Sequence, residues 1–454
     1  MFSKRVLLVV VISALLLATS ASAGAPAAEG AVPRQGMAGP WAGCAAQSDI
    51  PEEECEALVA LYHSTAGAGW ANHDSWLETD APCGWHGVAC DRGHVYGISL
   101  AVNGLSGTLP AGLADLSQIT YLNLADNTLT GSIPEELGGL AVLRALSLSR
   151  NQLSGHIPPE LTQLEQLAYL NLYGNQLTGS IPAGIGQLTQ LRSLALYDNL
   201  LEGGIPAGIG NLTQLTSLSL GENLLTDPVP AEIGALEKLE YLSLGGNQLS
   251  GSIPAEIGSL ASLQRLFLNA NRLEGAIPPE VGNLYNLTAM YLDCNRLEGE
   301  IPTSLANLTG LEHLDLSFNA LTATNPALRA FLDGIEPGWA DTQTVPPANI
   351  VATRYSPTAV ALSWTPIQYV GSGGYYQISL ADTWSGPFTV YATTDSKATG
   401  THLVDGLAPE TVYYFRLRTY STAYAIQHND VWSSYSRIVT VAGPFCAFLP
   451  LLER

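Results

Sequence analysis

Four side chains near residue 90 have the types and spacing that suit a zinc ion. Cys83, His86, Cys90 and His94 follow one another in the segment CGWHGVACDRGH. Structural zinc sites hold the metal with four cysteine and histidine ligands in a tetrahedral arrangement. The spacing alone leaves two interpretations open: a metal centre, or two bonded cysteines with two uninvolved histidines.

Two carboxylates are a second candidate for chemistry. Asp198 and Glu222 stand 24 residues apart, with Asp126 further upstream. If a repeat brings the pair together, they could share a cation or a proton, although most surface carboxylates are simply solvated. The chain has no GxSxG elbow, no phosphate-binding loop and no dinucleotide-binding glycine motif. The sequence therefore predicts no enzyme, no cofactor and no metal site.

A fixed repeat must position any such residues. Ten asparagines stand 24 residues apart, each with a leucine three residues before it, a leucine two residues after it and a proline seven residues after it. They are Asn103, Asn127, Asn151, Asn175, Asn199, Asn223, Asn247, Asn271, Asn295 and Asn319. The pattern LxxLxLxxNxL resembles the leucine-rich repeat, and the LxGxIP half that follows resembles its plant-type subclass, over residues 95–326. The resemblance implies a repeat solenoid with a parallel β-sheet on its concave face. Each asparagine should bond backbone groups of its own coil and the adjacent one.

Outward positions of this sheet can be identified from the repeat. Strand side chains alternate between core and solvent, and residues 24 apart become neighbours in adjacent coils. The outward positions lie six, four and two residues before each asparagine, and from them we predict ligand contacts by Tyr121, Tyr169, Tyr173, Tyr197, Tyr241, Arg265, Phe267, Tyr291, Asp293, His313 and Asp315. Tyr173 with Tyr197, and Phe267 with Tyr291, should stack about 5 Å apart. Tyrosine is a common recognition residue; the alternative is that it simply favours half-exposed strands.

The segment 51–94 is expected to cap the first coil. Residues 52–62 have the pattern of a short amphipathic helix with Leu58, Leu61 and Tyr62 on one face. The run CGWHGVAC that follows resembles the N-terminal cap of plant-type repeat proteins. A cap covers the apolar face and the strand edge that the first coil would otherwise expose.

The resemblance to an exported cap also bears on the cysteines. It favours a Cys83–Cys90 disulfide over the zinc site, and a second disulfide between Cys44 and Cys55. Cys294 interrupts a coil and is expected to be an isolated, partly shielded thiol. Cys446 is given no role.

The array should end in a helix and be followed by a second domain. Asn325 and Pro326 suit a helix N-cap and first residue, residues 327–335 have helical spacing, and 336–347 are expected to form a linker. Alternating short strands over 348–441 predict an all-β immunoglobulin-like sandwich. Trp364 and the motif Leu407-x-Pro409-x-Thr411-x-Tyr413-x-Phe415 resemble a fibronectin type III domain. The apolar tail 442–454 is too short to span a bilayer.

The first residues of the chain predict where the protein is located, and its net charge limits which partners it can bind. Lys4 and Arg5, the apolar run that follows and Ala21-Ser22-Ala23 have the form of a signal peptide over residues 1–23, cleaved after Ala23. Residues 24–50 are expected to form a flexible leader. Export predicts a secreted or cell-surface protein with no transmembrane span. The 18 basic residues are far outnumbered by 40 acidic ones, which excludes nucleic acid as a partner, because phosphate binding needs clustered Lys and Arg.

These observations predict a non-enzymatic exported binding or adhesion protein that recognises a protein or peptide on the concave face. The whole chain resembles secreted bacterial proteins that join plant-type repeats to a fibronectin type III module. The alternative is a glycan-binding protein, or an inhibitor of a polysaccharide-degrading enzyme, because plant polygalacturonase inhibitors share the cap and the repeat subclass.

Overall fold

The computed structural model describes residues 41–369, 373–409, 411–423 and 429–441. The expected signal peptide 1–23, residues 24–40 of the expected leader, and the apolar tail 442–454 with Cys446 lie outside the described residues.

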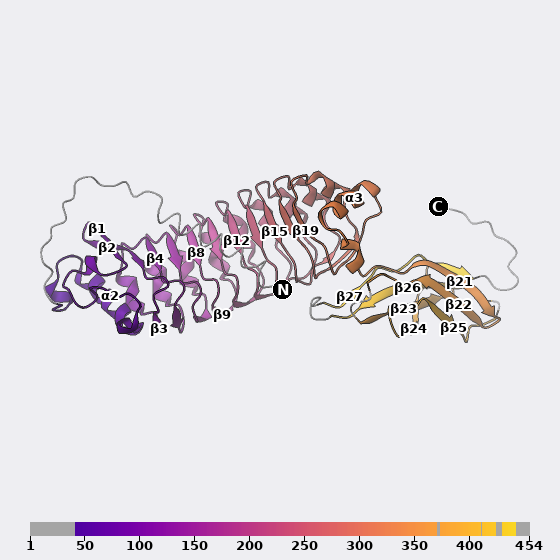
Figure 1. The fold of residues 1–454 in the computed structure, drawn as a ribbon, viewed down its shortest axis with the longest axis horizontal. Coiled ribbons are helices and arrows are strands. Elements are labelled where there is room, and N and C mark those ends of the chain that lie inside the picture. Colours follow the sequence, from indigo (N-terminus) through magenta and orange to yellow (C-terminus); the bar gives the residue numbers. More distant parts are fainter. Residues whose placement is uncertain (1–40, 370–372, 410, 424–428, 442–454) are drawn as a thin grey trace. The chain divides into compact units, whose positions relative to one another are not determined.

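The long sheet of the repeat array is one continuous ladder (Figure 1). Its 11 strands are, in spatial order, β1 (Val88–Asp91), β2 (His94–Ser99), β4 (Tyr121–Asn123), β6 (Ala145–Ser147), β8 (Tyr169–Asn171), β10 (Ser193–Ala195), β12 (Ser217–Ser219), β14 (Tyr241–Ser243), β15 (Arg265–Phe267), β17 (Ala289–Tyr291) and β19 (His313–Asp315). From β2 to β19 every pairing is parallel and aligns residues 24 apart, as Ser193 with Ser217. The predicted parallel sheet is confirmed. We call its solvent side the concave face, and number the coils 1 to 10 by their ladder asparagines, from Asn103 to Asn319.

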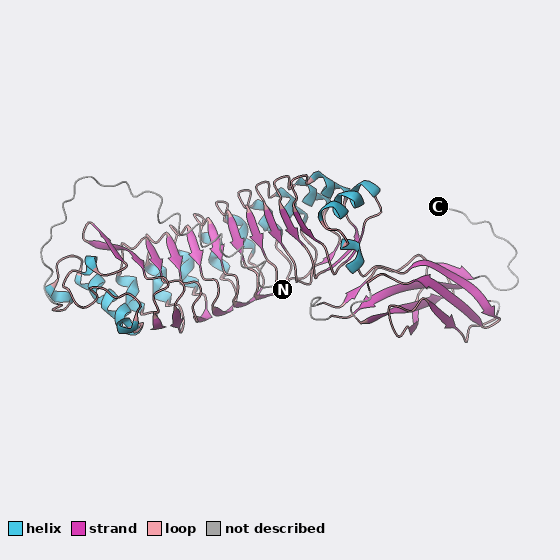
Figure 2. Cartoon of the chain, in the orientation of Figure 1, coloured by secondary structure: helices cyan, strands magenta, loops and turns pink. Residues whose placement is uncertain are grey.

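Every coil except coil 7 turns back through a second strand, and coils 1 to 9 then continue through a short 3-10 helix, so that the 3-10 helices lie on a different side of the array from the long sheet (Figure 2). The second strands are β3 (Ser106–Thr108), β5 (Thr128–Thr130), β7 (Ser154–His156), β9 (Gln176–Gly179), β11 (Leu200–Gly203), β13 (Leu224–Leu225), β16 (Glu274–Gly275), β18 (Arg296–Glu300) and β20 (Ala320–Thr322). The 3-10 helices are η4 (Ala111–Asp115), η5 (Glu135–Gly139), η6 (Pro159–Gln163), η7 (Ala183–Gln187), η8 (Ala207–Asn211), η9 (Ala231–Ala235), η10 (Ala255–Ser259), η11 (Pro279–Asn283) and η12 (Thr303–Asn307). A proline precedes each of these helices, and its fixed φ suits the start of a helical turn.

The ladder asparagines satisfy the backbone where the chain leaves each strand. In coil 6 the side-chain amide of Asn223 donates to the carbonyl oxygens of Leu196 at 3.0 Å and Leu220 at 3.1 Å. Its oxygen accepts from the Leu201 amide at 3.0 Å. The predicted ladder is confirmed. Because each buried polar group left without a partner costs about 1–3 kcal/mol, the ladder fixes the stacking of the coils.

The cap contains α2 (Glu52–Ser64), which buries Leu58 and Leu61, and β1, which pairs antiparallel with β2. Short 3-10 turns η1 (Cys44–Ala46), η2 (Gly67–Gly69) and η3 (Pro82–Gly84) complete it. The expectation of a flexible leader is wrong for residues 41–50, because Trp41 and Ile50 pack in the core and Cys44 is bonded to Cys55. The indole rings of Trp76 and Trp85 pack with centroids 4.9 Å apart.

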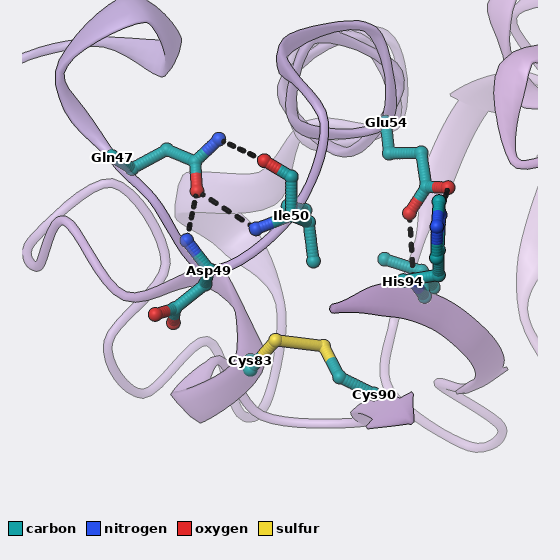
Figure 3. The surroundings of a disulfide bond; sticks show 8 residues. Gln47, Asp49, Ile50, Glu54, Cys83, Cys90 and His94 are labelled. Atoms are coloured by element: carbon teal, nitrogen blue, oxygen red, sulfur yellow. Dashed lines mark hydrogen bonds and ion pairs between the residues drawn. A yellow bond between two sulfur atoms is a disulfide. The ribbon is translucent and has the colours of Figure 1, made fainter. Parts of the chain in front are cut away.

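Both expected disulfides are present: Cys83 bonds to Cys90, and Cys44 bonds to Cys55. His94 lies in the same region, but its Nδ1 atom is hydrogen-bonded to Oε1 of the buried Glu54 carboxylate, at 2.7 Å (Figure 3). Glu54 also accepts from the Val95 amide at 2.7 Å and so joins α2 to the first parallel strand. Since the two sulfurs are bonded to each other and His94 pairs with Glu54, the zinc interpretation is not supported.

The helix predicted at the end of the array is present, but the segment after it differs from the prediction. In α3 (Pro326–Ile335) the Asn325 side chain accepts from the amides of Ala327 and Leu328, so it is the N-cap. Residues 336–347 were expected to form a linker. Instead, η13 (Trp339–Thr342) buries the Trp339 ring in the repeat core, and the Gln343 side chain is buried as well. This part of the expected linker belongs to the array.

The C-terminal domain is a two-sheet antiparallel sandwich, as predicted. One sheet contains β21 (Ala348–Ser356), β22 (Ala359–Thr365) and β25 (Thr401–Val404); the other contains β23 (Gly374–Ala381), β24 (Thr389–Thr393), β26 (Tyr413–Ser421), β27 (Val431–Trp432) and β28 (Val439–Val441). Trp364 is buried against Tyr376, with ring centroids 5.4 Å apart. The Tyr413 hydroxyl accepts from the Ala408 amide at 3.1 Å, which is the backbone contact of a tyrosine corner. No helix among the described residues is long and apolar enough to cross a membrane.

Candidate ligand-binding surface

The candidate residues named from the sequence all lie on the concave face or just beyond the end of its strands. Eight of them are within strands: Tyr121, Tyr169, Tyr241, Arg265, Phe267, Tyr291, His313 and Asp315. The other three, Tyr173, Tyr197 and Asp293, stand where the chain leaves a strand. All except Asp293 keep part of their surface exposed.

Three aromatic rings form a continuous group on coils 7 to 9, which we call the C-terminal aromatic cluster. The centroids of Tyr241 and Phe267 are 5.5 Å apart, and those of Phe267 and Tyr291 are 5.0 Å apart with ring planes inclined by 5°. The predicted stacking of Phe267 on Tyr291 is confirmed. Burial raises the pKa of Tyr241 to about 12, and the nearby Ser243 and Arg265 have smaller opposite effects. Its hydroxyl is therefore neutral at physiological pH.

The predicted stack of Tyr173 on Tyr197 is wrong. Among the described residues these two rings do not pair, although they occupy the same position in coils 4 and 5. Tyr173 instead lies beside the Arg150 guanidinium of coil 3: burial raises the pKa of the Tyr173 hydroxyl, and Arg150 acts against this effect. The sequence determines which position of the repeat a side chain occupies. Its rotamer depends on the side chains of the neighbouring coils.

Tyr197 leans the other way, toward coil 6. A Cβ atom added at Gly221 would stand 3.1 Å from Cδ2 of Tyr197 and 2.8 Å from the Gly245 carbonyl oxygen. The tyrosine ring therefore lies against the bare backbone of the next coil, at the same position in the repeat. Glycine at 221 is what leaves room for the ring.

Small side chains form a floor between Tyr197 and the C-terminal aromatic cluster. This floor consists of Ser193, Ala195, Ser217, Ser219, Gly221, Ser243 and Gly245, from coils 5 to 7. Tyr197 and Tyr241 stand at its two sides, close enough for Tyr241 to contribute to the raised pKa of Tyr197. The concave face thus has a low centre with aromatic rings on either side.

Charged residues form a row immediately before the ladder asparagines. Asp126, Arg150, Asp198 and Glu222 are all exposed and occupy this position in coils 2, 3, 5 and 6. The Arg150 Nε and Asp126 Oδ1 atoms form an ion pair at 2.8 Å. The sequence pointed to the acidic members of this row but missed Arg150. The opposite charges of Asp126 and Arg150, 24 residues apart, would have indicated it.

The remaining candidates are not brought into one site. Tyr121 packs edge-on against Tyr96 at 5.7 Å near the cap, and Tyr169 stands alone among the aromatic contacts of the described residues. Asp315 lies beside Glu336 at the other end. Burial and the Asp315 charge raise the pKa of Glu336 to about 7. This pair belongs to the end of the array rather than to its central surface.

Metal-binding and thiol chemistry have little support on this surface. In the described part of the chain, no group of three or more histidine, cysteine or acidic residues could hold a metal ion. Cys294 is a buried thiol whose pKa is raised, mainly by burial and then by Asp293. A raised pKa keeps the thiol protonated and therefore unreactive.

Comparison with protein families agrees with this architecture along most of the chain. A model of the leucine-rich repeat region matches residues 106–228, and a leucine rich repeat model matches residues 213–273 and 261–321. A fibronectin type III domain model matches residues 345–430. The chain is a leucine-rich-repeat array followed by a fibronectin type III domain.

Solved structures similar to this leucine-rich-repeat protein include two plant receptor ectodomains. The ectodomain of the Arabidopsis thaliana receptor kinase GASSHO1/SCHENGEN3, in complex with CASPARIAN STRIP INTEGRITY FACTOR 2, is 39% identical with a TM-score of 0.54 over 54% of this chain and 30% of that chain. The Arabidopsis receptor kinase HAESA, in complex with the peptide hormone IDA and the co-receptor SERK1, is 35% identical with a TM-score of 0.53 over 59% of this chain and 46% of that chain.

Two further relatives differ in coverage. A plant ice-binding protein is 29% identical with a TM-score of 0.53, over 62% of this chain and 92% of that one. The receptor protein kinase WSS1 of Oryza sativa subsp. japonica is 39% identical over 72 residues, which are 15% of this chain and 7% of the kinase. The leucine-rich-repeat protein therefore spans only a small part of the receptor kinase and less than half of each receptor ectodomain.

Proposed function

We propose that this protein is a non-enzymatic, exported binding protein that holds a peptide or an extended protein segment on the concave face of coils 4 to 9. The observation that carries the proposal is the arrangement of aromatic side chains around a low centre. Tyr197 stands on one side of the floor of small residues, and Tyr241, Phe267 and Tyr291 stand on the other.

The chemistry of these residues suits recognition. Tyrosine and phenylalanine supply large contact areas with few rotatable bonds, so they lose little entropy when a partner binds. Such rings are enriched among the residues that dominate binding energy. The backbone of the long sheet is already paired between coils, so side chains must provide most of the contacts.

The low floor has a matching role. Serine, alanine and glycine at these positions let a ligand backbone approach the sheet closely, while serine hydroxyls can exchange hydrogen bonds with it. The floor extends over coils 5 to 7, and adjacent strands lie about 4.8 Å apart. A short extended segment crossing the strands would span it and contact aromatic rings at both ends.

The similarity to a receptor of a peptide hormone supports a peptide ligand. HAESA was solved with a peptide hormone bound, and it is 35% identical to this chain. Two disulfides in the cap are in keeping with an oxidising, extracellular environment. The proposal involves binding without turnover, and the fibronectin type III domain acts in it as a second module or spacer.

The test is a selection of random peptides displayed on phage, using the full chain as bait. Peptides recovered from the selection should bind with an affinity that falls by about tenfold or more in the Tyr241→Ala/Phe267→Ala variant, the loss expected when anchoring aromatic residues are removed. A matched control is Leu200→Ala/Leu224→Ala, which removes two exposed side chains of the second strands β11 and β13. The control should bind as the parent does.

The proposal would be overturned if no peptide is recovered, or if both variants bind recovered peptides as tightly as the parent. Circular dichroism of each variant shows whether the fold is intact. A glycan array run in parallel addresses the alternative class of ligand. Retention of polysaccharide with no peptide recovered would replace the proposal with a glycan-binding role.

A further inference from the structure

The proposed function leaves unexplained the negative charge beside Tyr197. In the exposed row before the ladder asparagines, Asp126 is paired with Arg150 at 2.8 Å. Asp198 and Glu222 occupy the same position in coils 5 and 6, and the residue there is glycine in coils 4 and 7. Two carboxylates therefore stand in adjacent coils beside Tyr197.

These two carboxylates lie close to the tyrosines of the concave face. Burial is the main cause of the raised pKa of Tyr197, and the next causes are the charges of Glu222 and Asp198. Asp198 also acts on Tyr173. Asp198 thus lies near both hydroxyls, and Glu222 lies near that of Tyr197.

Backbone geometry holds the two acidic residues in place. Asp198 and Glu222 have φ angles of 57° and 50°, in the left-handed region that side chains other than glycine seldom adopt. A Cβ atom added at Gly246 would stand within 3.0 Å of both carboxylate oxygens of Glu222. The Glu222 carboxylate therefore lies against Gly246 of coil 7.

The Tyr197 ring provides the other half of the arrangement. The ring lies against Gly221, and the side chain is still partly exposed. A cation placed over the face of an aromatic ring is attracted by its quadrupole, and arginine makes this contact more often than lysine. Carboxylates beside such a ring would complement the same cation.

We infer that coils 5 and 6 hold a basic side chain of the bound peptide, with its guanidinium or ammonium group over the Tyr197 ring and beside the carboxylates of Asp198 and Glu222. This inference rests on the proposed function and specifies the chemistry of the ligand. It also gives the ligand a direction: the basic residue lies toward coil 5, and apolar residues lie toward the C-terminal aromatic cluster.

The experiment uses the full chain and the phage-displayed random peptides already described. Recovered sequences should be enriched in arginine or lysine at a fixed distance from an aromatic or aliphatic residue. A synthetic peptide from this pool is then compared with its twin in which the basic residue is replaced by glutamine. The replacement should weaken binding by about tenfold.

The Asp198→Asn/Glu222→Gln variant should bind the basic peptide with an affinity lower by a similar factor. Its affinity for the peptide with glutamine should stay within about twofold of the parent's. Asparagine tolerates the left-handed conformation at position 198, so the fold should persist. The matched control, Glu232→Gln/Glu256→Gln, makes the same change in net charge on the exposed helices η9 and η10. Binding by the control should be unchanged.

The outcomes separate the inference from the proposed function. If recovered peptides lack basic residues, or bind Asp198→Asn/Glu222→Gln as tightly as the parent while Tyr241→Ala/Phe267→Ala weakens them, the inference is wrong and the proposed function stands. If no peptide is recovered, both fail. A loss of affinity equal in the charge variant and in its control would show a general effect of charge and would also overturn the inference.

Discussion

Gln343 makes the hydrogen bonds of an eleventh ladder residue, 24 positions after Asn319. Its side-chain oxygen accepts from the Leu321 amide at 3.0 Å, and its amide group donates to the Leu316 carbonyl oxygen at 2.9 Å. Asn319 makes the equivalent bonds to Leu297 and Leu292 one coil earlier. The ladder therefore extends one step beyond the last asparagine, and the array is closed by the turn that contains Trp339.

Removing this last step should loosen the C-terminal end of the array. We expect Gln343→Ala to lower the free energy of unfolding by about 1–3 kcal/mol, because the buried Leu321 amide loses its acceptor and the Leu316 carbonyl oxygen loses one of its two side-chain donors. Denaturant unfolding measures the change. Gln152→Ala, at an exposed position in coil 3, serves as the control and should change stability by less than about 0.5 kcal/mol. Equal stability of Gln343→Ala and the parent would contradict the role of the eleventh step.

The end of the array should also respond to pH. Burial and Asp315 raise the pKa of Glu336 from its usual 4.5 to about 7. The folded state therefore holds a proton that the unfolded state releases, so stability should fall as pH rises from about 4.5 to 7 and then level off. Because Glu336 is only partly buried, solvent screening limits this effect to about 1–2 kcal/mol.

Glu336→Gln isolates this effect from the other acidic residues. We expect the melting temperature of the variant to fall less than that of the parent between pH 5 and pH 7, a difference measured by calorimetry at several pH values. Parallel curves for the two proteins would show that Glu336 does not carry the pH dependence.

The cap should depend on its disulfide and not on a metal. We expect Cys83→Ala/Cys90→Ala to lower stability by about 2–4 kcal/mol, since an open chain gains more entropy on unfolding. Tryptophan fluorescence would follow the change, because Trp76 and Trp85 pack in the cap. A chelator should leave the parent unaffected. Unfolding of the parent by a chelator would restore the zinc interpretation.

Gly221 should control the position of Tyr197. A methyl group at residue 221 would meet the Tyr197 ring and the Gly245 carbonyl oxygen, at 3.1 and 2.8 Å. We expect Gly221→Ala to displace the ring and to weaken peptide binding by about fivefold, with a stability cost of about 1–2 kcal/mol. Gly139, which has open space around it, provides the matched control as Gly139→Ala. Unchanged affinity in Gly221→Ala would remove Tyr197 from the binding surface.

Most of the fold could be predicted because it is periodic. One repeat, read ten times, determined the parallel sheet, the buried leucines and the asparagine ladder, and the neighbours of any residue followed from the 24-residue period. The ends were harder, because they leave the pattern. Gln343 occupies the next ladder position without being asparagine, so the segment around it was expected to be a linker.

The candidate surface was only partly predictable for a related reason. The outward positions of the strands were predicted correctly, and Phe267 and Tyr291 stack at 5.0 Å as expected. The position in the repeat did not determine which adjacent coil each side chain contacts. Tyr173 turns to Arg150 and Tyr197 turns to Gly221, since a charge before one ring and a glycine after the other decide the rotamers.

Hydroxyl-radical footprinting of the chain with a recovered peptide tests the central claim most directly. If the concave face of coils 4 to 9 is the binding surface, Tyr197, Tyr241, Phe267 and Tyr291 should become several-fold less oxidised in the complex. Tyr285, an exposed residue away from the concave strands, should be oxidised as before. Protection of Tyr285 or of the fibronectin type III domain, with the four concave rings unchanged, would contradict the account.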